Sequence, residues 1–370
     1  MTNAAAEVNS AAAFSRKERQ ILMKNRFAAI ALLIILTFTF SFNSFALSIT
    51  ESTQALNAQF SDGSYSDLLD YVSFSPVKGE SDNTEYPLFI WLHGKKSGYY
   101  PRAQLENYEI SNWASDEYQA RFSSAGGCYI LAPRVINSDK NSWTQELCSP
   151  LKGLIDCFVA ENSANIDTDR IYIGGFSIGG DMVWHMITAY PDFFAAAIPV
   201  AAISQPAATD LNKLNNMPLW LFTSDHDPYI INETSDVMPN FNYLCGISNK
   251  AENLRLTSFS EAFFADWSKK TETVDGQKKP AFDAEHYIWE AVTYDMFMAD
   301  GITPYACAKT IDSTGNVIEI SDPEDGVIRW LSAQSLADLS DAKPLSFFEQ
   351  LKHIFNRFIE MLREFFSFLL

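Results

Sequence analysis

Basic residues are scarce in this chain. Its 370 residues include 27 lysines and arginines against 46 aspartates and glutamates, so the formal net charge is −19. Proteins bind DNA and RNA chiefly through Lys and Arg side chains that neutralise phosphates, so this deficit argues against a nucleic-acid partner. We interpret the acidity as a solubility feature and not as the sign of a charged substrate.

Spacings typical of metal sites are also missing. The chain has five cysteines and five histidines, with no Cys-x-x-Cys pair and no His-rich run. We therefore predict no metal site. The odd number of cysteines leaves at least one thiol outside any disulfide within the chain, and Cys128 is expected to pack as a small core residue.

The apolar run at 27–42 is too short for an ordinary membrane span, with 16 residues. It is preceded by basic residues and followed by Ser44-Phe45-Ala46, whose small residues suit a signal cleavage site. We predict that residues 1–46 are a signal peptide or, alternatively, an uncleaved signal-anchor. In both cases the protein is expected to be secreted or displayed at the cell surface.

Between residues 64 and 335 short apolar runs alternate with helical patterns. Strands are expected at 68–74, 87–92, 128–131, 171–173, 194–200, 219–222 and, as the last strand, 254–259; helices are expected at 151–160 and 182–190. This alternation predicts an α/β fold with a doubly wound, mainly parallel sheet and helices on both faces. Residues 47–63 and 336–344 are expected to be linkers.

The run 171–180 contains the most informative motif, Gly175-Phe176-Ser177-Ile178-Gly179. A predicted strand precedes this Gly-x-Ser-x-Gly and a predicted helix follows it, which is the order of a nucleophile elbow. The small residues allow the strand and the helix to approach closely, while the helix N-terminus directs N–H groups at the serine. We predict that Ser177 is a nucleophile.

A serine nucleophile needs a histidine base, and elimination favours His286. The other histidines lie on the predicted elbow helix, at the end of a buried strand, beside the predicted acid and in the C-terminal tail: His185, His93, His226 and His353. His286 follows the last predicted strand and completes the order Ser, Asp, His that α/β-hydrolases use.

The acid that orients this base is expected in the loop after the strand at 219–222. Asp227 lies five residues past Phe222, within good reach of the histidine, and we favour it. Asp225 is the nearby alternative, although an aspartate at that point is also typical of a turn cap.

An oxyanion hole requires two backbone N–H donors. We predict that Ile178 supplies one and that Lys95, in the loop after the strand at 87–92, supplies the other. His93 is expected to brace this loop through hydrogen bonds, and it is a candidate pocket residue together with Trp143. A packed tryptophan with no role in the pocket is an equal alternative for Trp143.

These motifs resemble α/β-hydrolase esterases of the polyhydroxybutyrate depolymerase and feruloyl esterase group, which includes prolyl-oligopeptidase-like "predicted peptidases". The matching stretches are 87–94, 169–180, 191–200, 218–227 and 286–289, within about residues 65–335. The resemblance implies the α/β-hydrolase fold, and it supports Asp227, which keeps the family's acid position although Thr223-Ser224 replaces His-Gly. The segments 228–285 and 299–325 depart from the family, and we expect them to form a lid or a pocket wall.

The C-terminal residues 345–370 predict a separate amphipathic helix. Its apolar positions recur every three or four residues: Phe348, Leu351, Phe355, Phe358, Leu362, Phe365 and Leu369. Such a helix can dock on its own domain, lie on a membrane surface or associate with a second copy. Its polar face is balanced in charge, so attraction to anionic lipid is not expected.

Together these features predict an exported serine esterase that uses Ser177, His286 and Asp227 and needs no cofactor. Its substrate would be a small or polymeric ester, for example one linked to a polysaccharide or a polyester. A serine peptidase on the same scaffold is the first alternative. A non-catalytic surface binding module is the second, and the complete set of three residues argues against it.

Overall fold

The computed structural model describes residues 60–76, 84–95, 111–122, 126–136, 142–225, 227–230, 237–260, 271–274, 277–280, 286–298 and 301–340. The predicted signal segment and the predicted C-terminal helix at 345–370 lie outside these ranges, as do His226 and His353. No helix within the ranges is both long and apolar enough to span a membrane.

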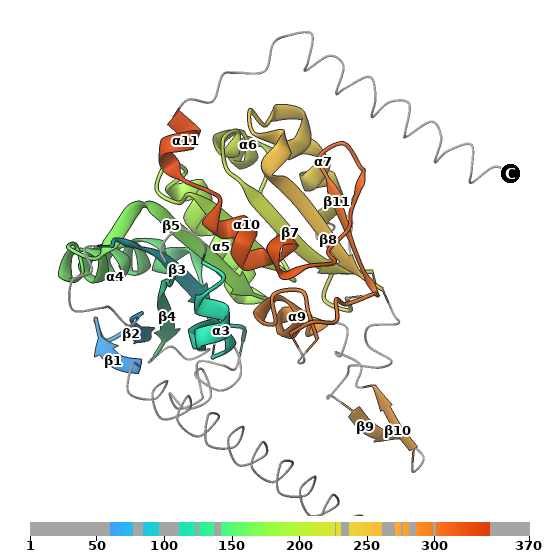
Figure 1. The fold of residues 1–370 in the computed structure, drawn as a ribbon, viewed down its shortest axis with the longest axis horizontal. Helices are drawn as coiled ribbons and strands as arrows, with labels where there is room; N and C mark the ends of the chain where they lie inside the picture. Colours follow the sequence, from blue (N-terminus) through green and yellow to red (C-terminus); the bar gives the residue numbers. More distant parts are fainter. Residues whose placement is uncertain are drawn as a thin grey trace, which may run out of the picture. The chain divides into compact units, whose positions relative to one another are not determined.

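One ten-stranded sheet, in the order β1-β2-β4-β3-β5-β6-β7-β8-β11-β12, organises the described chain (Figure 1). Its strands are β1 (Phe60–Ser64), β2 (Leu69–Phe74), β3 (Tyr86–Leu92), β4 (Tyr129–Val135), β5 (Ile166–Phe176), β6 (Ala196–Val200), β7 (Leu219–Ser224), β8 (Leu254–Phe259), β11 (Ala308–Asp312) and β12 (Val317–Ile318). The central strands from β4 to β8 run parallel, and the outer strands pair antiparallel. A separate antiparallel pair joins β9 (Thr271–Val274) to β10 (Gln277–Pro280).

The helices are mostly short. They are α3 (Asp116–Gln119), α4 (Cys148–Glu161), α5 (Ile178–Ala189), α6 (Ala208–Leu211), α7 (Val237–Ile247), α9 (Trp289–Thr293), α10 (Val327–Ser332) and α11 (Leu336–Ser340). Single 3-10 turns occur at Asn112–Ala114, Gln145–Leu147, Asn212–Leu214, Ala251–Asn253 and Pro323–Asp325.

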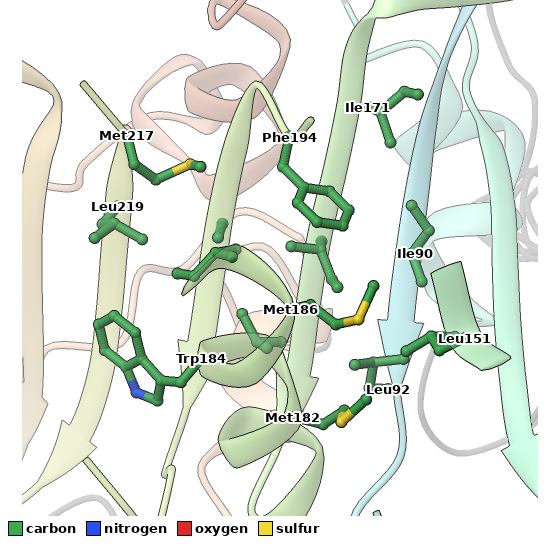
Figure 2. Packing of buried hydrophobic residues seen from close by; sticks show 14 of the residues in the cluster. Ile90, Leu92, Leu151, Ile171, Met182, Trp184, Met186, Phe194, Met217 and Leu219 are labelled. Carbon is green, nitrogen blue, oxygen red and sulfur yellow. The ribbon is translucent and has the colours of Figure 1, made fainter. Parts of the chain in front are cut away.

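Both faces of the sheet are covered, because its central strands are apolar throughout. Every residue of β3 is buried. On one face Leu92 packs in a cluster with Leu151 of α4 and Met182 of α5 (Figure 2). On the other face Phe89 stacks on Trp113, with ring centroids 4.3 Å apart. Continuous apolar strands of this kind are typical of a parallel sheet between two helical layers.

The predicted doubly wound, mainly parallel α/β sheet is therefore confirmed. The strand at 254–259 is not the last one, however, because β11 pairs with β8 and β12 pairs with β11. Both added strands are half exposed, and β12 forms the edge of the sheet, so they lack the apolar run that marks a central strand. The segment 299–325, expected to form a lid or pocket wall, supplies these strands and extends the sheet.

The ends of the domain also differ from the expected boundaries. The sheet begins at Phe60, inside the stretch expected to be a linker, since β1 pairs with β2 over its whole length. At the other end, α11 continues to Ser340, within the second expected linker. Polar sequences such as Phe-Ser-Asp-Gly-Ser carry little strand signal, and β1 depends on its partner strand.

Candidate active site

The strand β5, the turn at Ser177 and the helix α5 form a sharp elbow. Ser177 has φ 57° and ψ −123°, a strained conformation for a residue with a side chain. Its N–H donates to the carbonyl of Val200 at 2.8 Å, which fixes the turn against the end of β6. The same bond means that this N–H is not free to bind an oxyanion.

Close backbone contacts explain the two glycines of the motif. A Cβ atom at Gly179 would lie 2.1 Å from the carbonyl oxygen of Leu92, and a Cβ at Gly175 would lie 2.6 Å from that of Gly179. Neither contact is tolerable, and the obstructing atoms belong to the backbone. The motif therefore lets β3, β5 and α5 meet behind the serine.

Ser177, His286 and Asp227 are joined by a chain of hydrogen bonds. His286 Nε2 lies 2.7 Å from Ser177 Oγ, and Nδ1 lies 2.7 Å from Asp227 Oδ2. A carboxylate only accepts, so Nδ1 carries the proton and Nε2 presents its lone pair to the serine hydroxyl. All three residues are at most 5% exposed, so water is largely kept from these bonds.

Backbone bonds orient Asp227, and the competing Asp225 lies elsewhere. Asp227 Oδ1 accepts the N–H of Tyr229 at 2.9 Å, leaving Oδ2 for the imidazole. Asp225 Oδ1 instead accepts the hydroxyl of Ser258 on β8. The two aspartates of the loop thus have different partners, and only Asp227 contacts the histidine.

Aromatic rings surround the imidazole. The ring centroids of Phe176 and Tyr229 lie 5.0 and 4.7 Å from that of His286. Tyr287 and Trp289 pack in turn on Phe176. Such a wall limits the motion of the imidazole, and Tyr229 is 44% exposed. Sequence reasoning missed Tyr229, although its position two residues after the acid is a usable signal.

The loop after β3 is held by His93. Its Nε2 accepts the N–H of Val135 at 3.3 Å, so Nδ1 is protonated and donates to the carbonyl of Gly94 at 2.8 Å. Burial lowers the pKa of His93 to about 4, because the charged imidazolium would lose its hydration. His93 is therefore neutral near pH 7, and both of its ring nitrogens are bonded to backbone.

Trp143 packs against this brace and has little exposed surface. Its indole N–H donates to the carbonyl of His93 at 3.0 Å, and the side chain belongs to the buried cluster of Leu92. It therefore has the contacts of a packed residue and holds the loop in place. Lys95 is exposed, and the residues directly after it lie outside the described ranges. Ile178 is the first residue of α5, where N–H groups lack helical acceptors.

A buried ion pair joins the segment that follows His286 to the segment that follows α3. Arg121 donates to Asp295 at 2.8 Å, and Asp295 also accepts the N–H of Ile328 at 2.8 Å. The indole of Trp113 donates to the carbonyl of Thr293 at 3.0 Å. Sequence reasoning missed this anchor, since residues 174 positions apart give no local signal.

The described residues include no group of three His, Cys, Asp or Glu side chains that could hold a metal ion. Burial raises the pKa of the Asp181 carboxyl, one turn into α5, to about 6.

The candidate site consists of a serine, an imidazole and a carboxylate that are hydrogen-bonded in that order. It lies at the carboxyl ends of parallel strands, where open α/β sheets place their ligands.

This sheet and this elbow define the class of fold: the chain has the α/β-hydrolase fold. The model of the prolyl oligopeptidase family matches residues 143–250. A poly(3-hydroxyalkanoate) depolymerase C from Paucimonas lemoignei is 26% identical over 137 residues, which are 34% of this chain and 30% of that protein. The chain thus matches less than a third of the length of this relative.

One solved structure shows the same fold. A thermostable esterase superposes with a TM-score of 0.51 at 23% identity, covering 75% of this chain and 64% of its own. An acylaminoacyl peptidase from Pyrococcus horikoshii is more distant, with a TM-score of 0.35 at 17% identity over 50% of this chain and 34% of its own.

Proposed function

We propose that this protein is a serine esterase that hydrolyses carboxylic esters through an acyl-enzyme. The observation that carries the proposal is the pair of 2.7 Å hydrogen bonds from His286 to Ser177 and to Asp227. It is supported by the likeness to a depolymerase of polyesters and to an esterase. Export through residues 1–46 is part of the proposal and is consistent with a substrate outside the cytoplasm.

In the first step Ser177 Oγ attacks the ester carbonyl carbon while its proton moves to His286 Nε2. The carbonyl oxygen becomes an oxyanion, which the N–H groups of Ile178 and Lys95 would stabilise. The ester C–O bond then breaks, and the alcohol leaves with the proton held by His286. The imidazolium that exists between these events is stabilised by the adjacent Asp227 carboxylate.

In the second step His286 takes a proton from water, and the resulting hydroxide attacks the acyl carbon. The bond to Ser177 Oγ breaks, the serine recovers its proton, and the carboxylic acid is released. The chemistry needs no cofactor, because the imidazole of His286 accepts and returns each proton in turn.

Replacement of Ser177 tests the proposal directly. Ser177→Ala should abolish turnover of p-nitrophenyl acetate while the fold survives, because the removed hydroxyl is the nucleophile. Wild-type protein, but not the variant, should be labelled by a fluorophosphonate probe. Undiminished turnover in a folded Ser177→Ala protein would refute the assignment.

The two aspartates of the acid loop offer a matched pair. Asp227→Asn should lower kcat by about three to four orders of magnitude, since an amide favours the wrong imidazole tautomer. Asp225→Asn, two residues away and bonded to Ser258, should retain near-normal kcat. Equal losses in both variants would contradict the role given to Asp227.

A serine peptidase is the second candidate, favoured by the match of residues 143–250 to the prolyl oligopeptidase family. Ester and peptide bonds can both be attacked by the same three residues, so the test compares substrates. An acyl p-nitrophenyl ester and the p-nitroanilide of the same acyl group, assayed side by side, separate the candidates: preferential amide turnover would favour the peptidase.

A further inference from the structure

The first turn of α5 is hydrogen-bonded at two points to the segment that follows β6. The Ser177 N–H donates to the carbonyl of Val200 at 2.8 Å. One helical turn later, Asp181 Oδ1 accepts the N–H of Ser204 at 2.8 Å. Residues 200–204 are therefore attached at both ends to the turn that begins with Ser177.

This segment depends on bonds from neighbouring elements for its shape. Residues 201–204 belong to no helix or strand. Ala201 has φ 46°, in the left-handed region that a residue with a side chain adopts only at a cost. Its N–H donates to the carbonyl of Phe222 on β7 at 2.9 Å. That bond holds the start of the segment, and Asp181 holds its end.

The Asp181 carboxylate accepts several bonds from the segment. Besides the Ser204 N–H, the N–H of Ile203 and the hydroxyl of Ser204 donate to it. Burial raises the pKa of Asp181 to about 6, and these bonds act in the opposite sense. Asp181 is therefore mostly ionised near pH 7, and an ionised acceptor forms stronger hydrogen bonds than a neutral one.

Close packing would transmit a shift of the segment to the serine. A Cβ atom at Gly180 would lie 3.0 Å from the carbonyl oxygen of Val200 and 3.1 Å from the Cβ of Ala202, so the segment packs directly on the helix. Displacement of Val200 would also remove the acceptor of the Ser177 N–H, in a turn whose φ of 57° is already strained.

We propose that Asp181 is a positioning residue for the nucleophile. By attaching the segment after β6 to α5, its carboxylate holds the Val200 carbonyl against the Ser177 N–H and thereby fixes Ser177 for attack. Asp227 orients the imidazole, whereas Asp181 acts on the serine through backbone and does not touch the ester. This inference rests on the proposed function, because it concerns Ser177 as a nucleophile.

The rate at which a fluorophosphonate probe labels Ser177 tests the inference. Asp181→Ala should lower the maximal labelling rate about tenfold, because a displaced nucleophile attacks less often, and should leave the half-saturating probe concentration unchanged. Asp181→Leu keeps a similar volume and also lacks an acceptor, so the test does not depend on the folding of the alanine variant. Asp181→Asn keeps an acceptor oxygen and should recover most of the lost rate, which a general loss of stability would not explain.

Hydrogen exchange of the Ser177 amide gives a readout that needs no activity. We expect exchange about tenfold faster in Asp181→Ala than in the wild type, because the Val200 acceptor is held less firmly. Failure of the proposed function would appear as an unlabelled wild type. Failure of this inference would appear as a labelled wild type whose Asp181 variants are labelled at the same rate.

Asp210→Ala is the matched control. The Asp210 side chain, on α6, is 44% exposed, and its partner Lys213 is 51% exposed. Its removal should leave both the labelling rate and the exchange of the Ser177 amide unchanged. Wild-type labelling in a folded Asp181→Ala or Asp181→Leu protein, or an equal loss in Asp210→Ala, would overturn the proposal.

Discussion

At the scale of single residues, hydrogen bonds determine whether each of two buried histidines can transfer a proton. His286 has its protonated nitrogen against a carboxylate and its lone pair against a serine hydroxyl. His93 has its protonated nitrogen against the carbonyl of Gly94 and its lone pair occupied by the N–H of Val135. Both nitrogens of His93 are thus engaged by backbone, and no proton can be exchanged with a substrate.

The pH dependence of stability should report the neutral state of His93. Burial lowers its pKa to about 4, below the ordinary 6.5, so the unfolded chain binds the proton more readily. The stabilisation that comes from keeping His93 neutral is complete above 6.5, the pKa of the unfolded chain. It is lost as the pH falls through the folded pKa of about 4. It amounts to on the order of 3 kcal/mol between about pH 7 and about pH 4.

The variant His93→Asn can keep the bond to Gly94 and cannot titrate. Urea unfolding of both proteins at about pH 7 and about pH 4 should show a smaller loss of stability for the variant, by up to the order of 3 kcal/mol. Identical losses in the two proteins would mean that His93 is not held neutral by the fold.

At the scale of elements, the elbow depends on how closely β3 approaches α5. Gly179→Ala would place a methyl group 2.1 Å from the carbonyl oxygen of Leu92. We expect a loss of stability of at least about 2 kcal/mol, together with loss of esterase activity, because backbone must move to admit the methyl. Thermal unfolding and p-nitrophenyl acetate turnover measure the two effects.

A glycine elsewhere provides the control. At Gly153 in α4 the nearest atom to an added Cβ is the hydroxyl of Tyr65, at 2.2 Å, and that side chain can swing into solvent. Gly153→Ala should therefore be neutral or stabilising by up to about 1 kcal/mol, since alanine favours a helix. A stable, active Gly179→Ala protein would contradict the close approach.

The elements that the sequence predicts well are those whose signal is local. β3 and β7 are apolar runs, and α4 shows a clear helical stripe, so each was predicted within a few residues. The outer strands β1, β11 and β12 are not predicted, because their residues are polar or half exposed. Such strands form because a neighbour supplies the hydrogen bonds, and that neighbour is distant in the chain.

At the scale of the whole molecule, a buried ion pair between Arg121 and Asp295 joins two segments that are far apart in the sequence. The Asp295 carboxylate is 0% exposed and the Arg121 side chain 9%. Asp295→Ala would remove the buried counter-charge of Arg121 and leave it only the largely exposed Glu117, and breaking a buried pair typically costs about 3–5 kcal/mol. We expect a loss of that size in urea unfolding, with reduced activity because the segment after His286 loses its anchor.

The exposed pair Lys152 and Asp156 on α4 is the comparison. The Asp156 side chain is 53% exposed, so Asp156→Ala should change stability by less than about 1 kcal/mol. A similar small effect for Asp295→Ala would show that the buried pair is not the anchor.

The sequence also places the three hydrogen-bonded residues of the candidate site better than the contacts that support them. Ser177 follows from a local motif, and His286 and Asp227 follow from chain order and strand ends. The aromatic contact of Tyr229, the Trp143 bond to His93 and the Arg121 pair all depend on folding that brings distant segments together. Those contacts depend on how the folded chain packs, and no periodic pattern in the sequence predicts them.

The spacing of the hydrogen-bonded residues has a consequence for folding. His286 lies 109 positions from Ser177 and 59 from Asp227, so the three meet only when loops of that length have closed. Contacts of such long range form slowly, because chain entropy is lost before they are gained. We therefore expect turnover to recover later than helical circular dichroism after dilution from denaturant. Turnover would then report a late step in the folding of the sheet.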